Sequence, residues 1–105
     1  MDKKNCFEAG AVLARLHSKD IIHGDYTPAN LIESYTESGG KKIVVIDFGL
    51  SFISNDIEDK ATDVFTMLRA IDEKDAFLAG YKSYAKAERV FERVKVIEKR
   101  VRYAV

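Results

Sequence analysis

The stretch IIHGDYTPAN, residues 21–30, decides how this sequence is interpreted. Two β-branched apolar residues precede a His-Gly-Asp, and an Asn follows the Asp five positions later, with the only proline of the chain between them. Ile21 and Ile22 predict a buried anchor, whereas Gly24 and Pro28 are typical of a loop. We therefore expect an ordered loop that presents polar side chains, and such loops often carry chemistry.

A second motif, VVIDFGLSF at residues 44–52, is a β-branched run that leads into Asp-Phe-Gly at 47–49. An acidic residue at the end of a buried strand, followed by a glycine that lets the chain turn away, can present a carboxylate to a cation. Asn30 and Asp47 would then supply oxygen ligands to magnesium, and Asp25 would orient or deprotonate the acceptor of a phosphoryl group. The two motifs together predict phosphoryl-transfer chemistry.

Each motif also has a purely structural interpretation. A lone His-Gly-Asp or Asp-Phe-Gly occurs often by chance, and an Asp or Asn after a strand is commonly a turn former or a helix cap. Each motif alone favours the structural interpretation, but the two together favour the functional one. Their order, their spacing and the hairpin between them match a kinase catalytic loop followed by its metal-binding strand. His23 is expected to pack the loop, and His17 to be a packed or surface residue, neither of them a metal ligand.

Composition sets the bounds on what the chain can be. Its 105 residues, 47% of them hydrophobic, suffice for one small domain or a piece of a larger one. The 17 basic and 17 acidic residues cancel, so no global field favours nucleic acid or a membrane surface. Cys6 is the only cysteine, which excludes an internal disulfide and predicts a small buried apolar group. Because no apolar signal core or membrane-length run is present, we expect no membrane partner and a cytoplasmic protein.

Apolar periodicity predicts a mostly helical chain with one hairpin. Helical spacing places helices at residues 2–17, 58–71 and 76–84 and in the last segment, where one apolar stripe lies beside a basic flank. That stripe consists of Val90, Val94, Ile97 and Val101. A hairpin is predicted from a strand at 31–34 and a buried strand at 43–48, with two glycines at its tip. The predicted fold class is therefore α+β, with the small hairpin carrying the site.

The two motifs together resemble the protein-kinase-like superfamily. The run ISNDIEDKATDVFTMLRAI at residues 53–71 narrows the likeness to the small atypical, RIO-related kinase subunit of the KEOPS tRNA-modification complex. The resemblance covers essentially the whole chain. It implies that Asp25 is the catalytic aspartate, that Asn30 and Asp47 are the Mg²⁺ ligands through which ATP binds, and that Asp63 hydrogen-bonds the catalytic loop from beneath.

Spacing favours this branch over conventional protein kinases. Those kinases place a long activation segment after the Asp-Phe-Gly, whereas only a few residues separate Gly49 from Glu58 here. A peptide-docking platform and a phosphorylation-controlled loop are therefore not expected. Thr27 also stands where conventional serine/threonine kinases carry a lysine. The alternative is a small-molecule phosphotransferase of the aminoglycoside or choline kinase type, which shares the HGDxxxxN pattern but usually lacks the Asp-Phe-Gly glycine and the EDKATD run.

The resemblance implies that residues 1–105 are a kinase-like C-terminal lobe without its N-terminal lobe. No glycine-rich loop, strand lysine or paired helix glutamate precedes the catalytic loop. We therefore expect weak or absent nucleotide binding by the chain alone, with the N-terminal lobe either supplied in trans by another polypeptide or lost. A lobe that normally packs under another should also expose an apolar surface near the hairpin and first helix, and so self-associate.

Two functional hypotheses remain open at this point. In one, the chain is the catalytic part of an atypical serine/threonine kinase or ATPase that supports threonylcarbamoyladenosine modification of tRNA. In the other, it is a non-catalytic module that docks on the KEOPS threonylcarbamoyl-transferase subunit or on tRNA. The closing run at residues 93–105 resembles the family's basic C-terminal tail, although Val101 replaces the usual glycine. Its cations Lys99, Arg100 and Arg102 could contact tRNA, or they could form an ordinary solvated helix face.

Overall fold

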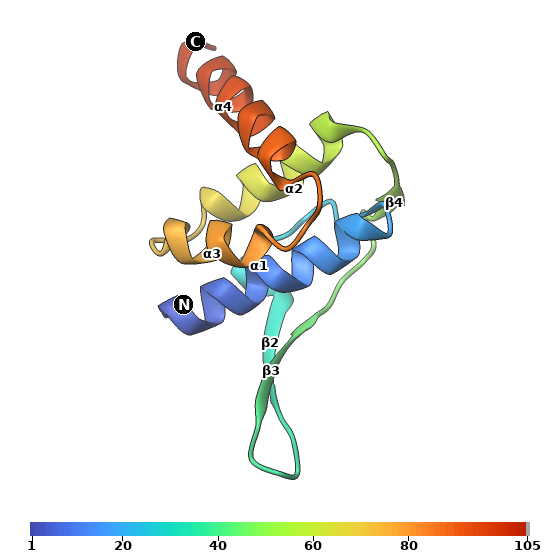
Figure 1. The fold of residues 1–105 in the computed structure, drawn as a ribbon, viewed down its shortest axis with the longest axis vertical. Coiled ribbons are helices and arrows are strands. Elements are labelled where there is room, and N and C mark those ends of the chain that lie inside the picture. The colour runs from blue at the N-terminus through green and yellow to red at the C-terminus, as the bar shows by residue number, and fades with distance from the viewer. Residues whose placement is uncertain (105) are drawn as a thin grey trace.

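A computed structural model describes residues 1–104 and shows an α+β fold with four helices and two small antiparallel sheets (Figure 1). The elements, in chain order, are α1 (Lys3–Ser18), β1 (Ile21–Ile22), a 3₁₀ turn (Pro28–Asn30), β2 (Leu31–Tyr35), β3 (Lys41–Val45), β4 (Phe52–Ile53), α2 (Ile57–Leu68), α3 (Lys74–Tyr81) and α4 (Ala87–Tyr103). The helices pack together, and the β2–β3 hairpin projects from them (Figure 1). The predicted α+β class is confirmed.

The helices pack as two pairs, α1 with α3 and α2 with α4. The first pair approaches closely because Gly10 and Gly80 face the partner backbone. A Cβ added to Gly10 would overlap the carbonyl oxygen of Phe77, and one added to Gly80 would overlap that of Phe7. Cys6 is fully buried in this core, as expected. Two helices have N-cap aspartates, Asp2 before α1 and Asp56 before α2. The side chain of each accepts a backbone N–H in the first turn of its helix.

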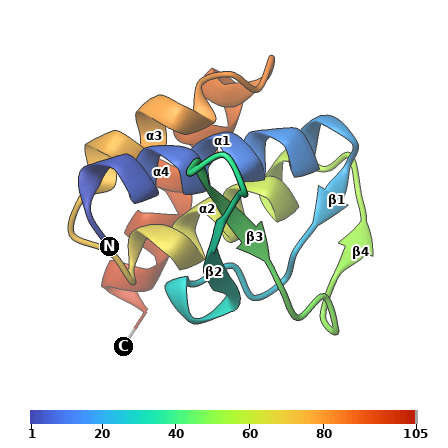
Figure 2. The ribbon, with the colours of Figure 1, turned by 90° about the horizontal axis from the view of Figure 1, so that it is seen from below.

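The hairpin forms between the two motifs as predicted, but its second strand is shorter than expected. Leu31 pairs with Val45 at the base of the hairpin, and β3 ends there. The prediction that the strand continues to residue 48 is wrong, because Asp47 adopts a left-handed backbone with φ of 58° that no β-strand accommodates. A second sheet was not anticipated. The two-residue strands β1 and β4 pair antiparallel at the edge away from the hairpin (Figure 2).

The helix predictions are correct in number and approximate in their ends. The second and third helices end at Leu68 and Tyr81, three residues earlier than predicted in each case. The apolar stripe of α4 is buried at Val90, Val94 and Ile97, but Val101 is 45% exposed because the helix end projects beyond α2 (Figure 1). Among residues 1–104, every helix is too short or too polar to span a bilayer.

An exposed apolar surface lies where the sequence predicts it. Phe7 on α1 and Ile32 on β2 are each about half exposed. The segment that follows Asp47 adds more, since Leu50 and Ile53 expose 67% and 74% of their area. Apolar side chains this exposed are typical of a surface that another chain or segment covers.

Candidate functional site

The His-Gly-Asp loop rests on one buried carboxylate, Asp63 of α2. Its Oδ2 accepts the backbone N–H of His23 at 2.8 Å, and its Oδ1 accepts that of Gly24 at 2.9 Å. The side chain is only 2% exposed. A carboxylate with several N–H donors in a dry site fixes the loop backbone strongly. The hydrogen bond from Asp63 to the loop, expected from the resemblance, is therefore present.

His17 of α1 completes the cluster around Asp63. Its Nε2 lies 2.9 Å from Asp63 Oδ2, and its Nδ1 lies 2.6 Å from the hydroxyl of Tyr81. Burial lowers the pKa of His17 below its ordinary value of 6.5, against the opposing effect of Asp63, which favours the charged form. The neutral ring suits both neighbours, because Nε2–H donates to Asp63 while Nδ1 accepts from Tyr81. His17 is thus a packed residue, as expected.

His23 joins the loop to the segment that carries Asp47. Its Nε2 lies 2.9 Å from the carbonyl oxygen of Ile46, and its Nδ1 accepts the backbone N–H of Asp25 at 3.1 Å. The ring is fully buried and lies 4.9 Å from the ring of Phe48, centroid to centroid. Both ring nitrogens of His23 are therefore used by backbone groups, one in the loop and one in the segment before Asp47. His23 packs the loop and connects it to that segment.

Asp25 and Asn30 are in direct contact. Asn30 Nδ2 donates to the Asp25 carbonyl oxygen at 2.8 Å and to Asp25 Oδ2 at 3.0 Å. The backbone carbonyl oxygen of Asn30 accepts the backbone N–H of Ile46 at 2.9 Å. This bond brings Ile46, the residue before Asp47, against the end of the loop. Within residues 1–104, the Asn30 Oδ1 accepts no hydrogen bond. That oxygen is therefore available to a ligand.

Asp47 lies on the exposed side of the site. Its left-handed backbone turns the chain out of β3, and within residues 1–104 its Oδ1 accepts only the backbone N–H of Gly49, at a long 3.3 Å. The donor set of Asn30 Oδ1 and the Asp47 carboxylate fits Mg²⁺, a hard cation that takes few protein oxygens and fills its shell with water and phosphate. No group of three or more His, Cys, Asp or Glu side chains within residues 1–104 could hold a metal by itself. The pair suits a metal that arrives with a nucleotide.

Two further residues that hold the loop in place, Lys60 and Tyr26, were not identified from the sequence. The ammonium of Lys60 is buried and donates to Asp20 Oδ1 at 2.6 Å and to the Tyr84 hydroxyl at 2.8 Å. Burial lowers the pKa of Lys60, but these two bonds raise it more, so the net shift is upward. The Asp20 carbonyl in turn accepts the N–H of Ser54, which ties the start of the loop to β4. Nothing in the EDKATD run marks Lys60 as buried, because its partners Asp20 and Tyr84 lie 40 and 24 residues away in the chain.

The buried residue Tyr26 anchors the loop to the core. Its ring is fully buried between the loop and α3, 6.5 Å from the Phe77 ring. Its hydroxyl donates to the Ala9 carbonyl at 2.6 Å. Burial raises the pKa of Tyr26 well above its usual range, so the hydroxyl keeps its proton and its bond. The loop is therefore fixed by its own aromatic residue as well as by Asp63.

A loop held by a buried aspartate, with an Asp–Asn pair at its end beside an Asp-Phe-Gly turn, is consistent with a kinase-like fold. Sequence comparison then identifies the family. The chain is 42% identical, over 98% of its length, to the probable serine/threonine-protein kinase BUD32 homolog of Archaeoglobus fulgidus, of which it covers 54%. It is 38% identical, over 92% of its length, to a probable bifunctional tRNA threonylcarbamoyladenosine biosynthesis protein of Methanocaldococcus jannaschii, covering 19% of that protein.

A third relative is the EKC/KEOPS complex subunit BUD32 of Encephalitozoon cuniculi. It is 48% identical over 61% of this chain, and the matched region makes up 29% of that protein. No family model matches the chain. The chain is thus similar, over nearly its whole length, to kinase-like proteins named BUD32, and the resemblance found in the sequence is confirmed. It spans about half the length of the Archaeoglobus relative and less of the other two.

Proposed function

We propose that residues 1–105 form the catalytic-lobe part of an atypical serine/threonine kinase or ATPase that acts in threonylcarbamoyladenosine modification of tRNA. The observation that carries the proposal is the preassembled loop. Asp25 and Asn30 contact each other above a buried Asp63, and the backbone N–H of Ile46, the residue before Asp47, donates to the Asn30 backbone carbonyl. The names of the relatives support the tRNA-modification role and the kinase class. We also propose that the chain binds other KEOPS subunits, including the threonylcarbamoyl-transferase subunit, and that it acts in the cytoplasm.

The residues divide the chemistry between them. Asn30 Oδ1 and the Asp47 carboxylate would hold Mg²⁺, which neutralises charge on the phosphates of ATP when bound. Asp25 accepts a hydrogen bond from Asn30 on one carboxylate oxygen, which fixes its direction. Its other oxygen would orient the attacking hydroxyl or water and take its proton. Rigid placement of this carboxylate is the main contribution of the loop, because positioning supplies much of the catalysis in phosphoryl transfer.

We further propose that the chain is inactive without a lobe that covers the nucleotide. The exposed apolar side chains after Asp47, among them Leu50 and Ile53, offer a surface for such a lobe. The same surface favours the second candidate function, a docking module without catalysis. The two differ in one respect, since a docking module needs Leu50 and Ile53 but does not need the carboxylate of Asp25.

Turnover with the N-terminal lobe restored tests the proposal. We predict that Asp25→Ala and Asp47→Ala each lower ATP hydrolysis or phosphoryl transfer about a hundredfold or more, because one removes the acceptor-orienting group and the other a metal ligand. The N-terminal lobe of the Archaeoglobus relative can be supplied in trans, and turnover followed by release of phosphate. Asp75→Ala, an exposed carboxylate on α3, is the matched control and should keep the wild-type rate. Wild-type rates in Asp25→Ala and Asp47→Ala, with docking intact, would favour the docking module.

A further inference from the structure

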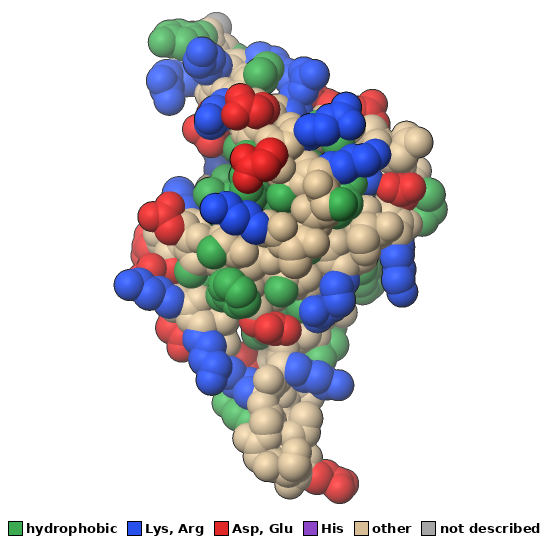
Figure 3. All heavy atoms as spheres, viewed as in Figure 1, with side chains coloured by type: hydrophobic (Ala, Val, Ile, Leu, Met, Phe, Trp, Pro, Cys, Tyr) green, Lys and Arg blue, Asp and Glu red, His purple; other side chains and the backbone are tan. Residues whose placement is uncertain are grey.

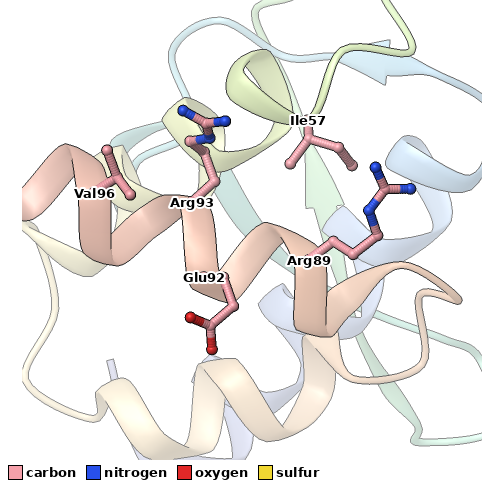
Figure 4. Close-up of a pocket in the computed structure, with 5 residues that line it drawn as sticks. All are labelled: Ile57, Arg89, Glu92, Arg93 and Val96. Carbon is pink, nitrogen blue, oxygen red and sulfur yellow. The ribbon is translucent and has the colours of Figure 1, made fainter.

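Four charged side chains of the EDKATD run lie in the first half of α2, and they contact different parts of the chain. They are Glu58, Asp59, Lys60 and Asp63. Asp63 holds the His-Gly-Asp loop. Glu58 faces α4, where its Oε1 lies 3.6 Å from Arg93 Nη1 and its Oε2 accepts from Arg100 Nη2 at 3.0 Å. Figure 4 shows Arg93 extending from α4 beside Ile57, the first residue of α2. The middle two charges of the run face a third region, the β1–β4 sheet.

Asp59 and Lys60 hold the two strands of that sheet at the same end. The ammonium of Lys60 donates to Oδ1 of Asp20, the residue before β1, at 2.6 Å. Oδ2 of Asp59 accepts from the hydroxyl of Ser54, the residue after β4, at 2.7 Å. The Asp20 backbone carbonyl also accepts the Ser54 N–H at 2.8 Å. Two neighbouring residues of one helix thus fasten both strands, which lie side by side in Figure 2. We call these four residues the α2 clamp.

Strand β4 belongs to the segment that leads out of the Asp-Phe-Gly turn. Along this segment the Phe48 ring lies 4.9 Å from the His23 ring, and the Leu50 carbonyl is so close to Gly24 that an added Cβ would overlap it. The segment buries little apolar area, since Leu50 and Ile53 are 67% and 74% exposed. Its position therefore depends on backbone contacts and on the α2 clamp instead of on a hydrophobic core.

The burial of Lys60 indicates that its charge has a specific role. Lysine and arginine side chains stand out along the surface of the molecule (Figure 3), whereas the Lys60 side chain is 1% exposed. Burying an ammonium costs free energy, and an apolar side chain of similar size often fills such a site equally well. The Tyr84 hydroxyl also accepts from this ammonium, at 2.8 Å. The two bonds place the ammonium at one point, from which it fixes the Asp20 carboxylate.

Asp20 has a backbone that needs such a restraint. Its φ of 60° is left-handed, a conformation that Asp and Asn adopt more readily than most residues but that still costs free energy. Strained backbone persists where surrounding contacts determine it. Asp20 accepts from Ser54 through its carbonyl oxygen and from Lys60 through its carboxylate. Its left-handed turn is therefore held from both sides, by the end of β4 and by α2.

We propose that Lys60 and Asp59 are positioning residues that hold residues 50–54 against β1, and thereby fix the turn that carries Asp47. In many switches a segment of this kind becomes ordered only when an added phosphate pairs with an arginine. Here Lys60 and Asp20 already form the ion pair, so the chain orders the segment by itself. The inference rests on the proposed function, because the segment leads out of the proposed metal site.

Amide hydrogen exchange of the full chain, followed by NMR, tests the α2 clamp directly. We expect Lys60→Met to raise the exchange rate of the Ser54 amide about tenfold or more, the factor that corresponds to a lost bond to a charged group. The amide of His23, which Asp63 holds, should change by less than about twofold. Lys82→Met, at an exposed position at the end of α3, is the matched control and should change neither rate. An unchanged Ser54 amide would overturn the proposal, and so would an equal rise at Ser54 and His23, which is the result of general destabilisation.

Two variants on other members of the clamp keep the test decisive if Lys60→Met does not fold. Asp20→Asn tolerates the left-handed backbone and removes the charge, and Asp59→Ala removes the acceptor of the Ser54 hydroxyl. Each should raise the exchange rate of the Ser54 amide. Combining Asp20→Asn with Lys60→Met should add little, because both remove the same ion pair. Fully additive effects of those two substitutions would show that the ion pair does not hold Ser54.

The Mg²⁺ dependence of turnover tests whether the α2 clamp positions Asp47. With the N-terminal lobe restored, Lys60→Met should raise the Mg²⁺ concentration for half-maximal ATP turnover several-fold, because a mobile turn holds the metal ligand less firmly. Lys82→Met should leave that concentration unchanged. A faster Ser54 amide with an unchanged Mg²⁺ requirement would contradict the effect on Asp47. If the wild type turned over no ATP, the proposed function would fail, while the exchange rates would still decide whether the clamp holds the segment.

Discussion

The two halves of the candidate site are built very differently. Beneath the loop, Asp63 is buried and accepts from His17, His23 and Gly24. On the far side, Asp47 is exposed, and its only protein partner within residues 1–104 is the N–H of Gly49. The carboxylate of the first half has all its hydrogen-bond partners within the chain, whereas that of the second half is exposed. The difference shows that the loop is fixed by contacts within the chain, and it supports the proposal that a bound metal and nucleotide complete the side that carries Asp47.

The same substitution, Asp to Asn, should have effects of very different size on the stability of the two halves. We predict that Asp63→Asn lowers the free energy of unfolding by about 2–3 kcal/mol. The reason is that the new NH₂ group must face at least one of the buried N–H donors that the carboxylate now accepts. Urea denaturation of the full chain measures the loss.

Asp47→Asn is the matched change on the exposed side. It should alter the free energy of unfolding by no more than about 0.5 kcal/mol, because Asn tolerates the left-handed backbone and the residue has a single weak contact. Equal destabilisation by the two substitutions would show that the two halves are not built differently after all.

Acid should weaken the buried half through His17. Its pKa is lowered in the folded state, so the unfolded chain takes up a proton first as pH falls through 6.5. Stability should therefore decline below that pH, by at most about 1.4 kcal/mol per pH unit from this group. His17→Gln keeps a donor for Asp63 and an acceptor for Tyr81 but does not titrate.

Chemical denaturation of both proteins between pH 5 and pH 8 separates this contribution from the carboxylates, which titrate at lower pH. The wild type should lose more stability than His17→Gln as the pH falls through this range. Parallel stability curves for the two proteins would rule out a neutral, buried His17.

Periodicity and motif spacing predicted much of this arrangement. Helical spacing located all four helices, and the family resemblance implied the bond between Asp63 and the loop. The β1–β4 pair escaped prediction because two residues per strand leave no periodic signal. The burial of Lys60 also escaped, since its partner Asp20 lies 40 residues away and only the fold brings them together. The early end of β3 depends on one backbone angle at Asp47, which composition does not encode.

Exposure of the apolar side chains was predicted from the lobe interpretation and not from local pattern. Nothing in the local sequence distinguishes Leu50 and Ile53 from core residues, yet both are largely exposed. Sequence alone marks such residues as apolar, and their burial depends on which other surfaces are present. The α4 stripe shows the same limit, because Val101 keeps the period of Val90 and Val94 but extends past the helix that covers them.

In the proposed function, Asn30 and Asp47 hold one metal together with a nucleotide. Mn²⁺, which prefers the same oxygen ligands as Mg²⁺, broadens NMR signals of nearby groups and reports this directly. With the N-terminal lobe restored and ATP present, Mn²⁺ should broaden the Asn30 side-chain amide and the Gly49 backbone amide first. Asp47→Asn should abolish that effect, and omitting ATP should weaken it, because the two residues supply only part of the shell. Broadening that leaves Asn30 and Gly49 untouched, or that persists in Asp47→Asn, would contradict the site.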